Sequence, residues 1–165
     1  MRKSSFATIG LAALSPLFAA PAIAQVATTT FNVQIIIDAE CLINSATDLD
    51  FGTTGVIAAP IDAASEIAVQ CTTGTPYNIG LNAGIGSGAT VDTRLMTGPG
   101  AATVAYSLYS DAGRSVVWGE TVGTNTVAST GTGADQVFPV YGRVPAQGTP
   151  ATGTYTDTVT VTVTY

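Results

Sequence analysis

The sequence contains no histidine and few ionisable residues, with five lysines and arginines against eleven aspartates and glutamates in 165 residues. The absence of histidine excludes the Ser-His and Cys-His pairs of nucleophilic enzymes. Arg2 and Lys3 lie at the N-terminus, and the other cations are the scattered Arg94, Arg114 and Arg143. Phosphate backbones need clustered basic side chains, so nucleic acid is not an expected partner.

The sequence also lacks an apolar run long enough for a membrane-spanning helix, which needs ~20 residues. The apolar stretch after Lys3 is interrupted by Ser15 and Pro16, and it ends at Ala22-Ile23-Ala24. A basic start, a short apolar stretch and small residues at this spacing predict a signal peptide over residues 1–24. The mature chain from Gln25 then has 141 residues and a net charge of −8, since three arginines oppose eleven acids.

Cysteine is scarce, and the two that occur are Cys41 and Cys71. An exported protein passes into an oxidising compartment, where one disulfide is the expected state. Closing a loop of about 30 residues contributes roughly 3–4 kcal/mol in the chain-entropy model. The alternative is a metal-binding or catalytic thiol, but no histidine is present to complete either site. No cofactor is expected.

Residues 25–38 (QVATTTFNVQIIID) begin the mature chain with a strand pattern. At a period of two, Phe31, Val33, Ile35 and Ile37 share one face, and Ile36 is the exception on the other. We expect a strand over residues 31–43. Such a terminal strand packs either into its own domain or into a neighbouring molecule.

The C-terminal segment alternates even more regularly, with threonine at each even-numbered position from 154 to 164. The other face consists of Tyr155, Asp157, Val159, Val161, Val163 and Tyr165. Asp157 is the single polar member of that face. Alternation of apolar residues with threonine predicts a half-buried strand over residues 155–165.

Threonine, valine, glycine and alanine dominate the mature sequence, and no window has a sustained helical period with caps. Residues 57–67 are expected to form a loop or one helical turn. Short strands with turn signals between them are expected at 48–52, 66–72, 77–83, 94–96, 103–110, 115–118 and 137–144, the last with Pro139 at an edge or bulge. Many short strands and one disulfide indicate an all-β sandwich in a single domain.

Several residues could carry chemistry, but each has a simpler interpretation. The carboxylate pairs Asp48/Asp50 and Asp38/Glu40 could bind a cation or act in acid–base chemistry, yet a solvated strand face is favoured. The glycine-rich residues 84–88 resemble part of a phosphate-binding loop, but no helix follows, which favours a hairpin loop. Trp118 and the tyrosines are interpreted as core and edge residues rather than a sugar-binding platform. The chain is therefore not expected to be an enzyme.

Three groups of residues, in order, are more specific than these fragments. The first consists of Cys41, LDFG at 49–52 and VQC at 69–71, the second of YSLYSD at 106–111 and VYGRVP at 140–145, and the third of GTYTDTVTVTV at 153–163. Together they resemble the spore coat protein U domain family, which includes the subunits of Csu-type pili, the archaic class of chaperone–usher pili.

This resemblance implies an incomplete immunoglobulin-like β-sandwich that is completed by a donor strand from a neighbouring subunit. Residues 25–37 would be the donor strand, with Phe31, Val33, Ile35 and Ile37 as plugs, and residues 38–165 the pilin domain. The acceptor groove and the chaperone-facing strand would include Tyr155, Val159, Val161, Val163 and Tyr165. Cys41 and Cys71 match the disulfide positions of the family.

The resemblance also implies a function and a set of partners. The function is that of a structural pilus subunit, exported through the periplasm to the cell surface for adhesion and biofilm formation. Its partners would be copies of itself in a head-to-tail homopolymer, a periplasmic chaperone, an outer-membrane usher and other pilus subunits. Two alternatives remain, a coat-like or surface protein of the same fold that does not polymerise in this way, and an adhesive tip subunit.

Overall fold

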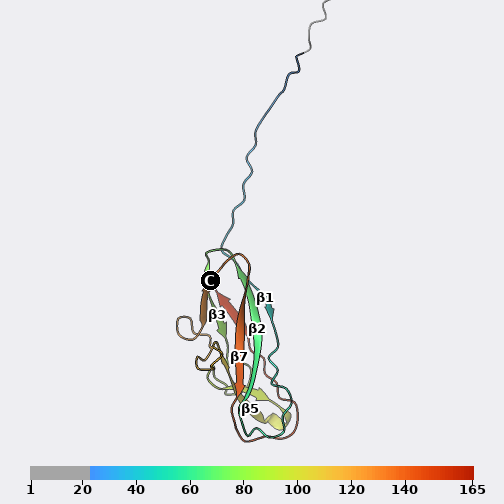
Figure 1. Ribbon diagram of the computed structural model, residues 1–165, viewed down its shortest axis with the longest axis vertical. Helices are drawn as coiled ribbons and strands as arrows, with labels where there is room; N and C mark the ends of the chain where they lie inside the picture. Colours follow the sequence, from blue (N-terminus) through green and yellow to red (C-terminus); the bar gives the residue numbers. More distant parts are fainter. Residues whose placement is uncertain (1–22) are drawn as a thin grey trace, which may run out of the picture. The chain divides into compact units, whose positions relative to one another are not determined.

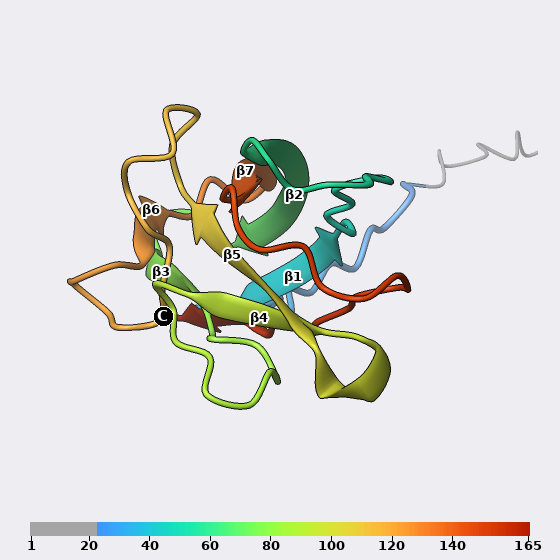
Figure 2. The same ribbon diagram turned by 90° about the horizontal axis from the view of Figure 1, so that it is seen from below.

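Two β-sheets and one short 3-10 turn make up the computed structural model, which describes residues 23–165 (Figure 1). In the order β1–β2–β7–β5–β4, the larger sheet contains β1 (Cys41–Ala46), β2 (Ile61–Cys71), β7 (Asp135–Val144), β5 (Thr103–Tyr109) and β4 (Arg94–Thr97). In the order β6–β3–β8, the smaller sheet contains β6 (Val127–Thr130), β3 (Pro76–Leu81) and β8 (Val161–Thr164). The turn η1 (Pro99–Ala101) joins β4 to β5 (Figure 2). The all-β prediction is confirmed.

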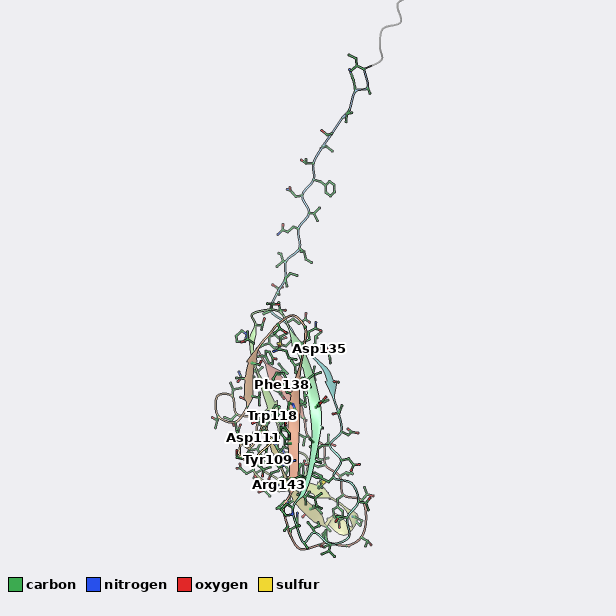
Figure 3. All side chains as sticks on the ribbon, in the orientation of Figure 1. Tyr109, Asp111, Trp118, Asp135, Phe138 and Arg143 are labelled. Atoms are coloured by element: carbon green, nitrogen blue, oxygen red, sulfur yellow. A yellow bond between two sulfur atoms is a disulfide. The ribbon has the colours of Figure 1, made fainter. Side chains whose placement is uncertain are left out.

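Residues 23–35 form a unit separate from Ile36–Tyr165, which holds both sheets. The inner faces of the two sheets share one apolar core, in which Val69 of β2 and Ile79 of β3 are fully buried. Trp118 is also buried (Figure 3), and its indole Nε1 donates a hydrogen bond of 2.8 Å to the carbonyl oxygen of Ile79. None of the helices within residues 23–165 has the length and apolar character needed to cross a bilayer.

The longest ladder of the larger sheet joins β2 to β7, from Ile61 opposite Val144 to Gln70 opposite Asp135. On its other side β2 pairs with β1, and this register places Cys41 directly opposite Cys71. The two cysteines form a disulfide, which confirms the interpretation of the cysteine pair as a disulfide.

The expected loop or helical turn over residues 57–67 is confirmed for 57–60 and wrong for 61–67, because β2 begins at Ile61. Its small side chains give little local preference, and pairing with β7 decides the conformation. The partner of Glu66 in that ladder is Pro139. On its other side β7 meets β5 only at residues 141–143, so the missing N–H of Pro139 leaves no ladder bond unmade. Pro139 thus occupies a local edge of an otherwise central strand.

Other strand predictions were too long or misplaced. Residues 31–40 and 48–52 belong to no strand, and the first strand is β1 instead. Residues 115–118 contribute a single bridge, between Val117 and Tyr109, and β8 covers only four residues of the expected C-terminal strand. The loop containing 84–88 connects β3 to β4, which lie in different sheets, so it is not a hairpin loop. The sequence pattern gave the extended conformation, but strand pairing depends on partners elsewhere in the chain.

Candidate functional site

A groove runs between the segment that follows β1 and the segment that leads into β8. Two adjoining hollows of about 730 Å³ and about 610 Å³ form it, and both are lined by Leu49 and Phe51 on one side and Tyr155 on the other. The floor is apolar and includes Ile67, Leu81, Leu108 and Val140, which come from four strands of the two sheets. We call this feature the groove. Its floor suits apolar side chains, and its rim is polar.

Two glycines allow the walls to lie close against the larger sheet. A Cβ atom on Gly142 of β7 would come within 2.9 Å of the side chains of Leu49 and Phe51. A Cβ atom on Gly98 would come within 2.5 Å of the ring of Tyr155. Both contacts are shorter than van der Waals distance, so larger residues at either position would displace a wall of the groove.

The backbones of both walls lack sheet partners along the groove. Within residues 23–165, no backbone–backbone hydrogen bond involves 48–56 on one wall or 157–159 on the other. Beyond these segments, β1 pairs only with β2, and β8 pairs only with β3. Exposed edges with free N–H and C=O groups are templates for an added strand. The groove therefore offers an apolar floor together with unpaired backbone on either side.

Residues 23–37 have the complementary character, and we call them the arm. They lie in no strand, and no hydrogen bond joins them to another described residue. Phe31, Val33 and Ile35 are 84%, 85% and 81% exposed, and Ile37 is 70% exposed. Four large apolar side chains at alternate positions that contact no core are a strong sign of a partner surface.

Asp157 is a polar exception within the groove. Its carboxylate accepts hydrogen bonds from the hydroxyl of Tyr106 (2.7 Å) and the backbone N–H of Ile85 (2.8 Å). Burial and, next, this carboxylate raise the pKa of the Tyr106 hydroxyl, which therefore remains a donor. Further along, the side-chain oxygen of Asn82 accepts from the N–H of Thr160 at 2.8 Å. Side-chain bonds thus hold the C-terminal wall where the backbone ladder is interrupted.

A model of the Spore Coat Protein U domain matches residues 27–162, which includes most of the arm and nearly all of the two-sheet domain. The chain belongs to the Spore Coat Protein U domain family. This membership confirms the resemblance found in the sequence motifs.

A curated relative aligns with nearly the whole chain. Protein U of Myxococcus xanthus is 32% identical, with 99% of this chain and 98% of that protein aligned. Among solved structures, a chain of the CsuC–CsuE chaperone–tip adhesion subunit pre-assembly complex of Acinetobacter baumannii is 26% identical with a TM-score of 0.55. That match includes 77% of this chain but 40% of the other, so this chain spans less than half of that length. A chaperone–usher pilus structure, described in terms of rod uncoiling, has 18% identity and a TM-score of 0.48, over 88% of this chain and 99% of that one.

The structure distributes the expected acceptor residues of this family member over three environments. Tyr155, Val159 and Val161 line the groove. Val163 packs half-buried against the core. Tyr165 is 60% exposed and borders a separate shallow hollow. The plugs of the arm have no contact that would assign them a partner, so their role stays a prediction.

Sequence reasoning missed the role of Arg94, which it treated only as one of a few scattered charges. The side chain is fully buried, and its guanidinium donates to four carbonyl oxygens, those of Leu81, Asn82, Val91 and Trp118, at 2.8–2.9 Å. Burial lowers the pKa of this guanidinium. These bonds fix the crossover between β3 and β4 behind the groove. No local sequence signal distinguishes such an arginine from an exposed one.

Of the two acidic pairs, Asp48/Asp50 contains a side chain that shapes a turn. Asp50 accepts a hydrogen bond of 2.7 Å from the N–H of Gly52, which has a positive φ of 74°. Across residues 23–165, no three His, Cys, Asp or Glu side chains come together in a way that could hold a metal ion. Asp38 and Glu40 lie next to Thr72, at the base of the arm.

Proposed function

We propose that this protein is a structural subunit of a chaperone–usher pilus, assembled by donor-strand exchange. The family match and the likeness to a chain of the Csu complex indicate a chaperone–usher pilus subunit. The observation that carries the finer proposal is the coexistence of an apolar groove with unpaired walls and an exposed arm of alternating apolar plugs. In this proposal residues 25–37 are the donor strand and residues 38–165 the receiving domain.

Strand addition would pair the free backbone of the groove and bury the exposed apolar side chains of the arm. A donor strand lying in the groove would pair its backbone with the free walls and bury Phe31, Val33, Ile35 and Ile37 over the apolar floor. Burial of a large apolar side chain contributes ~1.5–3 kcal/mol, so four contribute roughly 6–12 kcal/mol as an upper bound. Because donor and acceptor are different surfaces of one chain, the contact is heterologous and extends into a filament.

The proposed assembly route follows the family. Residues 1–22 lie outside the described residues, so the signal peptide over 1–24 stays part of the proposal. A periplasmic chaperone would cover the groove before assembly, and an outer-membrane usher would exchange its strand for the arm of the next subunit at the cell surface. The role is structural, in adhesion and biofilm formation, and involves no catalysis.

The experiment compares the mature chain with a variant that lacks residues 25–37. The mature chain should form oligomers that resist SDS without heating, and the shortened chain should stay monomeric. A synthetic peptide of residues 25–37 should bind the shortened chain with one-to-one stoichiometry, and the same peptide with Ile35→Asp should not. Normal filaments from the shortened chain would refute donor-strand exchange through the arm.

A second candidate function is a coat-like or surface protein of the same fold that does not polymerise in this way. The observation that favours it is the 32% identity to Protein U of Myxococcus xanthus across nearly the whole of both chains, within a family described by a spore coat protein. In that case the arm would fold into the groove of its own domain. A soluble monomer of the mature chain, with the arm protected from proteolysis, would support this alternative.

A further inference from the structure

The base of the arm is held by one residue, Thr72, through its side chain and its backbone. We call residues 38–40 the root. The hydroxyl of Thr72 donates a hydrogen bond of 3.1 Å to the carbonyl oxygen of Asp38 and accepts one of 3.2 Å from the N–H of Glu40. The backbone N–H of Thr72 donates to the carbonyl oxygen of Glu40 at 2.9 Å. A threonine hydroxyl has one proton to donate, and the carbonyl oxygen of Asp38 at 3.1 Å is a nearer acceptor than that of Glu40 at 3.4 Å. Its lone pairs accept from the N–H of Glu40 at the same time.

Thr72 is itself firmly placed. It directly follows Cys71, which ends β2 and is bonded to Cys41 at the start of β1. Its carbonyl oxygen accepts a hydrogen bond of 3.0 Å from the N–H of Thr75, within the turn before β3. The root is therefore fixed at both ends, by the disulfide at Cys41 and by the Thr72 hydroxyl at Asp38. Such side-chain bonds to the backbone hold a segment that belongs to no strand.

This anchoring leaves almost no free linker. Ile37, the last plug, directly precedes Asp38, whose carbonyl is already held by Thr72. One extended residue spans about 3.4 Å. A flexible linker of several residues would instead let neighbouring domains take many relative orientations. A groove that receives Ile37 must therefore approach the root closely.

We propose that Thr72 is a positioning residue, which holds the backbone of the root against the end of β2 and so makes the connection between successive subunits stiff. This inference rests on the proposed function, because stiffness matters only if the arm joins two subunits. The anchoring itself is a property of the single chain and is testable without a polymer. The alternative is that the root is a free hinge and the hydroxyl contacts contribute nothing to it.

The first test measures backbone motion of the root in the monomer, which the peptide of residues 25–37 keeps from polymerising. In the mature chain, amide order parameters of Ala39 and Glu40 should be near 0.85, and Thr72→Val should lower them below about 0.6. Thr72→Ser keeps the hydroxyl and should restore them. Thr73→Val is the matched control, because Thr73 is the next residue along the chain and its side chain is exposed. Equal order parameters in the Thr72→Val variant and the unmodified chain would overturn the inference.

The second test measures the stiffness of the fibres by electron microscopy. Thr72→Val should lower the persistence length about two-fold or more while SDS-resistant oligomers remain, because the plugs are unchanged. Insertion of Gly-Ser-Gly after Asp38 frees the root directly and should have at least the same effect. Fibres of the Thr72→Val variant that are as stiff as those of the unmodified chain, beside flexible fibres of the insertion variant, would refute the role of Thr72. Failure of the unmodified chain to polymerise would instead refute the proposed function.

Discussion

The arm and the C-terminal segment carry the same sequence pattern but differ in what they contact. The arm alternates over residues 31–37, with Ile36 as the exception, and the C-terminal segment alternates over residues 154–165 with Asp157 as its polar exception. Val159, Val161 and Val163 are half-buried against the core, whereas Phe31, Val33 and Ile35 are more than 80% exposed. Alternation thus defines an extended segment and its apolar face, but not the surface on which that face packs. We propose that the arm finds its surface in another molecule.

The largest expected effect is on the arm, through a charge on its apolar face. Ile35→Asp should abolish SDS-resistant oligomers, because a plug is lost and an unpaired carboxylate would enter an apolar groove, which costs several kcal/mol. The melting temperature of the monomer should not change, since Ile35 is 81% exposed in its own molecule. Ile36→Asp, on the opposite face, is the control and should polymerise. Equal loss of oligomers in both variants would show that the alternating face has no role.

The same change in the C-terminal segment should act on the fold itself. Val161→Asp puts a charge among core side chains and should lower the free energy of unfolding by about 3 kcal/mol, measured by urea denaturation of the monomer. Thr162→Asp, whose side chain is exposed, should change it by less than about 0.5 kcal/mol. If Val161→Asp left the monomer as stable as the unmodified chain, the contrast between the two segments would not hold.

The sequence predicted the extended backbone and the apolar face of both segments, but not the position of every strand. The periods of two around Val33 and Val161 predicted extended backbones and apolar faces, and two cysteines predicted the disulfide. The pattern predicted a strand at residues 48–52, which lie outside both sheets, and it missed the first residues of β2, which begins at Ile61. Both errors arise because strand pairing is decided by segments distant in the chain. The burial of Arg94 could not be predicted for the same reason, since the four carbonyl oxygens that accept from its guanidinium lie between residues 81 and 118.

A smaller effect is expected from the polar anchor of the C-terminal wall. Asp157→Ala leaves the hydroxyl of Tyr106 and the N–H of Ile85 without their acceptor, which should cost about 1–3 kcal/mol of stability in urea denaturation. Tyr106→Phe removes only one of these bonds and should cost less. Because the anchor holds a wall of the groove, Asp157→Ala should also weaken binding of the peptide of residues 25–37. A variant that loses stability but binds the peptide unchanged would restrict Asp157 to the fold.

The smallest expected effect is the pH dependence of stability, which should arise in the two-sheet domain and not in the arm. Residues 25–37 contain no ionisable side chain, whereas the domain contains Asp111, whose carboxylate accepts hydrogen bonds from the N–H groups of Val116 and Ser115. The bond from Val116 is the main cause that lowers the pKa of Asp111 below its ordinary value of 3.8. A carboxyl whose pKa is lower in the folded state contributes stability above its unfolded pKa, and this is lost as the pH falls through the folded value. The urea concentration at the unfolding midpoint should therefore decrease as the pH is lowered below about 4, and this decrease should be smaller in the Asp111→Asn variant. An identical pH profile for Asp111→Asn and the unmodified chain would show that the turn at Asp111 does not contribute.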